Sequence, residues 1–314
     1  MTDMNPHLRS ITPTDTANTR QPMWATRLEG AARILLVAIA SVVISGSLYL
    51  LAYMVMNPEG AEEWTVGRRP NQYYTAIDHD ALTFSTAAYG TIFGVAHNSG
   101  GSIEATLEAL INGADVIEID VVELDGALYS AHTPPLPFLG QRWFRGPRLD
   151  RVWAASVGAD AVMLDLKDSS PHFVRLVGDF LESRPSTRQV IVSSRSPWVL
   201  QLIRVRAPEA ILLLSVPHDA ALRAMQNNEP LLETIDGITV RHTVLDADHA
   251  AWLSDQGLLV FAWTVEDLER VNELMRLGVD GITSDNLAIV SLFAGETGSE
   301  RALRRTPVPE GLDE

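Results

Sequence analysis

Two short patterns in the sequence place pairs of charged side chains on one face of an extended chain. Glu118 and Asp120 are separated by one apolar residue, and so are Asp165 and Lys167. Residues two apart in a strand point to the same side, so the members of each pair face one direction. Converging carboxylates repel one another unless a divalent cation neutralises them, and oxygen ligands suit Mg²⁺ or Ca²⁺ better than zinc. The pattern indicates a metal site formed by Glu118, Asp120 and Asp165.

Two histidines and one lysine accompany these carboxylates. His97 follows a short apolar run, and His132 follows a hairpin-like return through Asp125-Gly126. Imidazoles exchange protons near neutral pH, which suits general acid and base catalysis. Lys167 is the only lysine in the chain, which favours a point charge on a flexible stem over a planar guanidinium at this position. An ammonium beside a metal can hold a phosphate oxygen and stabilise its developing charge.

Short apolar runs alternate with helical stretches between residues 89 and 292. The eight runs are Ile92–Ala96, Val116–Val122, Ala161–Leu166, Val190–Ser193, Ile211–Ser215, Gly237–Val240, Leu259–Thr264 and Gly281–Thr283. The helical stretches are residues 102–112, 173–183, 198–205, 247–256 and 265–277, with Gly257 and Gly278 at C-cap positions. This alternation predicts an α/β fold, a (β/α)8 TIM barrel whose active site lies at the C-terminal ends of the strands. A doubly wound open sheet shows the same alternation and stays an alternative.

The first helical stretch, residues 102–112, has the pattern of an amphipathic helix. Ser102 stands at the N-cap position. The apolar residues that fall on one face are Ile103, Leu107, Leu110 and Ile111.

Residues 34–56 form an uncharged, apolar run of about 23 residues, which is long enough to cross a bilayer as a helix. A cleaved signal peptide is less favoured because the run is too long and no small-residue cleavage pattern follows. Arg20, Arg27 and Arg33 precede the run, and this bias places residues 1–33 in the cytoplasm. The sequence therefore predicts a single-pass plasma-membrane protein with an extracytoplasmic body, a linker over residues 57–88 and a mobile tail over 293–314.

The overall composition narrows the classes of partner. The chain has 314 residues, of which 46% are hydrophobic, and this is enough for one large domain or two ordinary ones. A net charge of -16 argues against nucleic acid as a partner of the body. The absence of cysteine excludes disulfides and thiolate metal sites.

Taken together, these motifs resemble the glycerophosphodiester phosphodiesterases, metal-dependent PLC-like TIM-barrel enzymes, over about residues 94–287. The matching pieces are Val95-Ala96-His97, Gly113–Val121, Asp125-Gly126 followed by His132, Asp165-Leu166-Lys167, Trp263-Thr264-Val265 and Gly278–Asp285. The resemblance implies that His97 and His132 are the catalytic pair and that Lys167 binds the phosphate. It also implies that Glu118, Asp120 and Asp165 hold Ca²⁺ or Mg²⁺. Trp263 would then line the substrate pocket.

The chain departs from this family at the phosphate contact. The family usually has His-Arg where this chain has His97-Asn98, and that arginine normally touches the phosphate. Asn98 can donate one neutral hydrogen bond, which is about half as strong as a charge-assisted one. Arg195 and Arg241 follow the fourth and sixth apolar runs. We expect at least one of these two substrate-binding candidates to lie within reach of the metal site.

The sequence thus predicts a membrane-anchored phosphodiesterase. Its substrates would be glycerophosphodiesters or lysophospholipids, hydrolysed to glycerol 3-phosphate, or a related phosphomonoester, and an alcohol. Two alternatives stay open. The Asp165-Leu166-Lys167 element also resembles the sphingomyelinase D-like phospholipases, which cleave the other side of the diester and can release cyclic phosphates. A barrel with a weakened phosphate contact could also bind a phospholipid head group without turnover.

Overall fold

The computed structural model describes residues 35, 37, 39–48, 74–75, 92–132, 144, 146–184 and 188–294. The chain divides into two compact units, residues 1–67 and 68–314. In the first unit, residues 35, 37 and 39–48 are helical and exposed. No helix within the described ranges combines the length and apolar character that a membrane span needs. The other residues of the predicted span, the predicted N-terminal tail, and most of the predicted linker and C-terminal tail lie outside these ranges.

The second unit is built on a closed sheet of eight parallel strands. They are β1 (Phe93–Ala96), β2 (Val116–Leu124), β4 (Ala161–Leu166), β5 (Gln189–Ser194), β6 (Ile211–Val216), β7 (Gly237–Arg241), β8 (Leu259–Trp263) and β9 (Gly281–Ser284). Each strand pairs with the next, and β1 pairs with both β2 and β9. This closure confirms the predicted barrel and excludes the doubly wound sheet. A ninth strand, β3 (Ala127–Ser130), pairs antiparallel with the end of β2.

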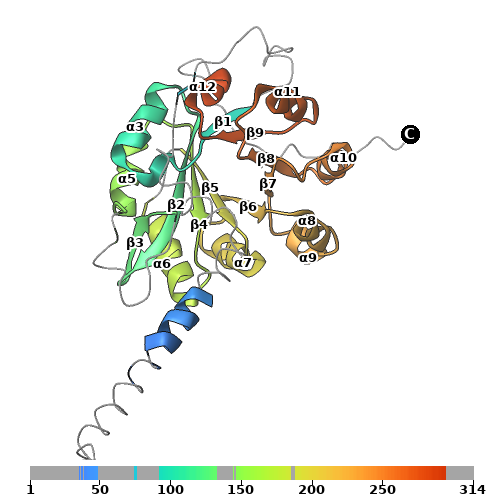
Figure 1. Ribbon diagram of the computed structural model, residues 1–314. Coiled ribbons are helices and arrows are strands. Elements are labelled where there is room, and N and C mark those ends of the chain that lie inside the picture. Colours follow the sequence, from blue (N-terminus) through green and yellow to red (C-terminus); the bar gives the residue numbers. More distant parts are fainter. Residues whose placement is uncertain are drawn as a thin grey trace, which may run out of the picture. The chain divides into compact units, whose positions relative to one another are not determined.

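Helices follow the strands and surround the barrel (Figure 1). They are α3 (Ile103–Ile111), α5 (Leu149–Ala155), α6 (Pro171–Glu182), α7 (Pro197–Arg206), α8 (Asp219–Gln226), α9 (Glu229–Leu232), α10 (Ala247–Asp255), α11 (Leu268–Arg276) and α12 (Leu287–Val290). Short 3-10 helices, η3 (Ser99–Gly101) and η4 (Ser291–Phe293), complete the unit. Gly257 and Gly278 have φ angles of 63° and 75° at helix ends, which confirms them as C-cap glycines.

Of the apolar face predicted for α3, only Leu110 packs against the core. Ser102 does cap the helix, since its Oγ accepts a hydrogen bond from the Ala105 N–H at 3.0 Å. The buried residues, however, are Thr106 and Ala109, whereas the side chains of Ile103, Leu107 and Ile111 are 36%, 47% and 85% exposed. The segment that precedes the helix approaches β2 closely, since a Cβ on Gly100 would lie 2.5 Å from Ile119. Only small side chains fit against strands at that distance.

The interior of the barrel holds its own apolar cluster, separate from the larger core between strands and helices. Its members are Phe93, Val95, Val116, Ala161, Met163, Ile191, Leu213, Leu259 and Phe261. Because side chains alternate along a strand, residues two or four positions further along the same strands also face inward, at the C-terminal mouth. His97, Glu118 and Asp165 are such residues. The polar side chains at the C-terminal mouth therefore lie next to the apolar cluster that fills the barrel interior.

Three aspartates join neighbouring strands at the opposite, N-terminal end. Each directly precedes a strand, and its Oδ2 accepts a backbone N–H from the adjacent strand at 2.8 Å. The bonds run from Gly94 to Asp115, from Leu212 to Asp236 and from Val260 to Asp280. We call these three residues the N-terminal aspartates. Their role is structural, because they satisfy buried N–H groups where strands begin.

Candidate active site

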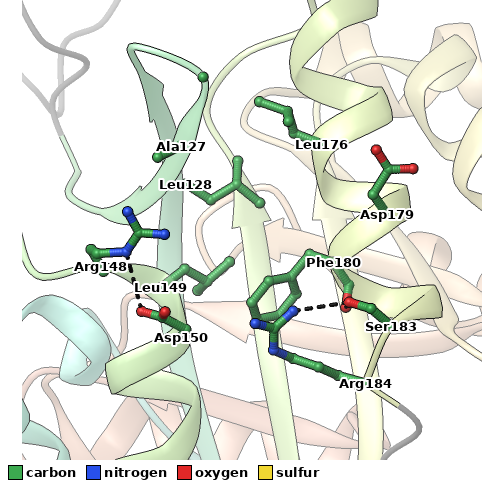
Figure 2. A pocket seen from close by; sticks show the side chains of 11 residues that line it. Ala127, Leu128, Arg148, Leu149, Asp150, Leu176, Asp179, Phe180, Ser183 and Arg184 are labelled. Carbon is green, nitrogen blue, oxygen red and sulfur yellow. Dashed lines mark hydrogen bonds and ion pairs between the residues drawn. The ribbon is translucent and has the colours of Figure 1, made fainter.

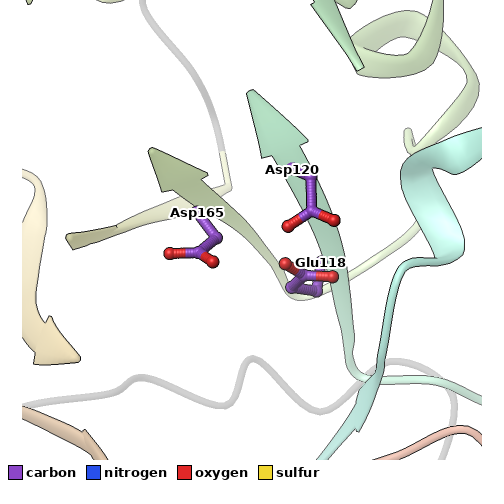
Figure 3. A group of neighbouring side chains, drawn as sticks. All are labelled: Glu118, Asp120 and Asp165. Atoms are coloured by element: carbon purple, nitrogen blue, oxygen red, sulfur yellow. The ribbon is translucent and has the colours of Figure 1, made fainter. Parts of the chain in front are cut away.

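The three carboxylates predicted to bind a metal meet at the mouth. Asp120 on β2 and Asp165 on β4 are register partners. Each of Glu118, Asp120 and Asp165 offers an oxygen within 4.8 Å of the others, and Figure 3 shows the three groups pointing toward one another. Glu118 and Asp120 are only 4% and 3% exposed. The sequence prediction that these side chains converge is confirmed.

Burial makes this cluster electrostatically costly without a cation. Burial, and then the charge of Asp120, raise the pKa of Glu118 well above its ordinary value. Burial also acts to raise the pKa of Asp120, but the charges of Lys167 and His132 hold it down at about 2. Burial and the neighbouring carboxylate charge thus disfavour ionisation of Glu118, as expected for carboxylates that share a buried site.

Lys167 lies within this cluster. Its Nζ is 2.8 Å from Asp120 Oδ1 and 2.5 Å from Asp165 Oδ2. Burial opposes the ammonium charge, yet the two aspartates raise the pKa of Lys167 above its usual value, so it stays protonated. Three carboxylates and one ammonium leave a formal charge of -2. This all-oxygen set therefore fits one divalent cation such as Mg²⁺ or Ca²⁺.

His97 follows β1 and is held by a carboxylate that the sequence analysis gave no role. Its Nδ1 lies 2.8 Å from Asp285 Oδ1, and its backbone N–H donates to Ser284 O at 3.1 Å. Burial acts to lower the pKa of His97, but the hydrogen bond and charge of Asp285 outweigh it and raise this pKa to about 9. The sequence signals for Asp285 were its place at the end of the Gly278–Asp285 motif and directly after the eighth strand.

Asn98 contacts the carboxylate cluster through its backbone. Its φ of 51° lies in the left-handed region, which asparagine tolerates better than most residues. This conformation directs the Asn98 N–H to Glu118 Oε2 at 2.6 Å. The side chain is buried, and its Oδ1 has no hydrogen-bond partner in the described part of the chain. A role of this amide in substrate binding stays a prediction.

His132 reaches the site from the β2–β3 hairpin. Asp125 and Gly126 form its two-residue turn, with φ angles of 52° and 76°, as the favoured hairpin turns require. Directly after β3, the Ala131 N–H donates to Asp120 O at 3.0 Å. The next residue is His132, close enough that its charge lowers the pKa of Asp120. The predicted hairpin-like return through Asp125-Gly126 is confirmed, and a catalytic role of His132 stays a prediction.

Arg241 and Trp263 lie together at the ends of β7 and β8. They are register partners, and Cζ of Arg241 is 5.5 Å from the centroid of the Trp263 ring. Arg195 directly follows β5 and is exposed. That either guanidinium reaches the metal site stays a prediction.

A surface cavity of about 240 Å³ lies away from these residues. It opens between the β2–β3 hairpin, the start of α5 and the second half of α6 (Figure 2). Leu128, Leu149 and Phe180 contribute apolar walls, and Arg184 lies over the Phe180 ring at 4.2 Å. None of the predicted site residues lines this cavity.

Comparison with known proteins agrees with the motifs. Residues 153–289 match the family model described as "Glycerophosphoryl diester phosphodiesterase family". The resemblance predicted from the sequence is thereby supported over these residues. The match includes Asp165, Lys167 and Trp263, whereas both histidines and the Glu118–Asp120 pair precede it. No curated protein matches the chain.

Solved structures share the fold at low identity. A phosphodiesterase from Oleispira antarctica, in complex with the product sn-glycerol-3-phosphate, is 17% identical with a TM-score of 0.54, covering 67% of this chain and 98% of its own. A putative glycerophosphoryl diester phosphodiesterase from Agrobacterium tumefaciens is 18% identical with a TM-score of 0.53, covering 64% and 96%. Another from Silicibacter pomeroyi is 18% identical with a TM-score of 0.52, covering 64% and 93%. At such identities these structures support the barrel fold.

Proposed function

We propose, from the family match and the geometry of the mouth, that this chain is a divalent-cation-dependent hydrolase of glycerophosphodiesters. One observation carries the proposal: Glu118, Asp120 and Asp165 converge within 4.8 Å of one another around the single lysine of the chain. Such a cluster is costly to bury without a cation. These three carboxylates would hold Mg²⁺ or Ca²⁺, which supplies Lewis-acid polarisation of a phosphoryl oxygen when bound.

The remaining groups have complementary roles. Lys167 offsets the single negative charge of the phosphodiester. His132 accepts the proton of the attacking water, whose oxygen forms the new bond to phosphorus. His97 donates a proton to the leaving alkoxide as the old P–O bond breaks, because Asp285 engages its Nδ1 at 2.8 Å and favours the imidazolium. Nε2 is then the ring nitrogen that can serve the substrate.

The proposed products are glycerol 3-phosphate, or a related phosphomonoester, and an alcohol. The complex of the Oleispira antarctica phosphodiesterase with sn-glycerol-3-phosphate supports this substrate class. We include lysophospholipids because the chain carries an uncharged run over residues 34–56. We propose that this run anchors the protein in the plasma membrane, with the barrel outside the cytoplasm.

The anchor has its own test. Protease added to intact spheroplasts should degrade the barrel, whereas the N-terminal tail should be cut only after lysis. Protection of the barrel with an accessible N-terminus would reverse the orientation. Release of the chain by high salt or carbonate would contradict an integral anchor.

The hydrolase is tested with a panel of glycerophosphodiesters and lysophospholipids, with and without chelator, and with identification of the products. Glu118→Gln should abolish both turnover and calorimetric binding of Mg²⁺ or Ca²⁺. The matched control is Glu123→Gln on the same strand, where the side chain points to the opposite face from that of Glu118. The Glu123 Oε1 accepts a hydrogen bond from Gly126 N at 2.6 Å, and a glutamine oxygen can accept the same bond. Undiminished activity in excess chelator would refute the metal requirement.

The same panel distinguishes the alternatives. Lys167 lies 2.5 Å from Asp165 within the element that also resembles the sphingomyelinase D-like enzymes. Attack by a substrate hydroxyl in place of water would release a cyclic phosphate, and its appearance would favour that reaction. Binding of phospholipid head groups without turnover of any diester would favour the binding module.

A further inference from the structure

One part of the mouth brings a guanidinium and an indole together. Arg241 and Trp263 are register partners on adjacent strands, and the guanidinium carbon lies 5.5 Å from the indole centroid. Side chains two residues apart on a strand point to the same face. Phe261, two residues before Trp263, belongs to the interior apolar cluster. Thr239, two residues before Arg241, contacts the Ser193 hydroxyl of β5 inside the barrel. This guanidinium–indole pair therefore belongs to the barrel mouth.

The strand order places this pair across the mouth from the carboxylates. Starting from β2, four steps in either direction around the closed sheet lead to β7, and four steps from β4 lead to β8. Arg241 is thus opposite the Glu118–Asp120 pair, and Trp263 is opposite Asp165 and Lys167. A diester whose phosphate lies at the carboxylate side can extend one of its two substituents across the mouth toward Arg241 and Trp263.

We propose that this pair makes the site selective for diesters whose substituent carries an anionic or acceptor-rich group, and that it disfavours quaternary ammonium groups such as choline. The inference rests on the proposed function, because it assumes that the phosphate lies at the carboxylates. It names Arg241 as a specificity-determining residue.

The physical reason is competition for one aromatic face. An indole face attracts a cation through its quadrupole, which is how aromatic residues recognise quaternary ammonium groups. Here the guanidinium already occupies that position over Trp263, so a second cation would lose the ring face and meet a like charge. A guanidinium also carries five N–H donors in a planar fork, a geometry that suits a carboxylate or phosphate.

Three non-hydrolysable phosphonate analogues of equal length test this selectivity. Their substituents end in trimethylammonium, in its neutral tert-butyl isostere, and in carboxylate. The readout is the Kd of each for the full chain in detergent with Mg²⁺, measured by calorimetry. The carboxylate should bind on the order of tenfold more tightly than the trimethylammonium, the difference expected from exchanging like-charge repulsion for a charged hydrogen bond.

Variants assign the effect to Arg241. Arg241→Gln should reduce the carboxylate preference to within about twofold, and Arg241→Lys should keep part of it because the charge remains without the planar fork. The control is Arg223→Gln on α8, an exposed arginine that pairs with Asp219, and it should keep the full preference.

Binding and turnover separate the two proposals. The selectivity is overturned if the trimethylammonium analogue binds wild-type protein as tightly as the carboxylate, if neither binds, or if Arg241→Gln keeps the preference. Turnover of the matching phosphodiesters is measured in parallel. Absence of turnover with the preference intact would refute the hydrolase and support the selectivity, whereas turnover without preference would refute the selectivity alone.

Discussion

Asp285 Oδ1 lies 2.8 Å from Nδ1 of His97, and this contact joins the end of the last barrel strand to the end of the first. A carboxylate on one ring nitrogen fixes the orientation of the imidazole and stabilises its protonated form. It outweighs the opposing effect of burial and raises the pKa of His97 to about 9. The contact therefore defines both the direction and the protonation state of this side chain.

Replacing Asp285 with Asn should shift the alkaline limb of the pH profile. A general acid must be protonated, so activity falls as pH rises through its pKa. Wild-type kcat/KM should decline near the raised pKa of about 9, and loss of the carboxylate charge should move that decline to lower pH. Profiles between about pH 6 and 10 measure the shift. Asp255→Asn on the exposed end of α10 is the control, and an unchanged limb in Asp285→Asn would contradict the assignment.

Both histidines should be needed for turnover. His97→Ala and His132→Ala should each lower kcat by about a hundredfold or more, the size expected for loss of a general acid or base. His172→Ala on the exposed surface of α6 should leave kcat unchanged. A His132 variant that keeps most of its activity would remove the proposed base.

At least one arginine should compensate for the residue missing at Asn98. Arg195→Ala should lower kcat/KM by about tenfold or more for every diester, in line with the ~1.5–3 kcal/mol of a hydrogen bond to a charged group. Arg241→Ala, across the mouth from the carboxylates, should lower it only for diesters with an anionic substituent, and steady-state kinetics with a choline and a carboxylate diester measure both variants. If neither variant changes kcat/KM, the phosphate depends on the metal and Lys167 alone.

The N-terminal aspartates should matter for stability rather than for chemistry. Asp115→Ala leaves the buried N–H of Gly94 without its acceptor at 2.8 Å, which should lower the free energy of unfolding by about 1–3 kcal/mol. Asp115→Asn should cost less because an amide oxygen can still accept. Urea unfolding measures both variants, with Asp255→Ala as the surface control. Loss of turnover at unchanged stability would contradict the structural role.

The barrel strands were predictable because they are nearly all buried. A strand covered on both faces forms a continuous apolar run, and all eight runs became strands within one or two residues of their predicted ends. The carboxylate cluster was predictable for the same reason, since Glu118 and Asp120 interrupt such a run with charge. Two-residue periodicity places both on one face before any tertiary contact is known.

Other features depend on tertiary contacts that a sequence does not display. The apolar pattern of α3 does not reveal that its buried residues are Thr106 and Ala109, whereas Ile103 and Ile111 are exposed. Asp115 and Asp280 belong to the motifs that resemble the phosphodiesterases, yet they join strands at the far end of the barrel. The Arg241–Trp263 pair and the Asp285–His97 contact both depend on register between strands.

The closing position of β9 has a consequence for when the enzyme becomes competent during synthesis. Its register pairs Val95 with Thr283 and Ala96 with Ser284, so the last barrel strand to leave the ribosome docks on the first. Glu118, Asp120, Asp165 and Lys167 have all emerged well before that event, whereas Asp285 arrives with the final strand. A nascent chain that lacks β9 thus carries the carboxylate cluster without the partner that orients His97. For the proposed hydrolase, competence is in this way tied to synthesis of β9, and a product truncated before β9 would retain the proposed cation-binding groups but not the proposed proton donor in position.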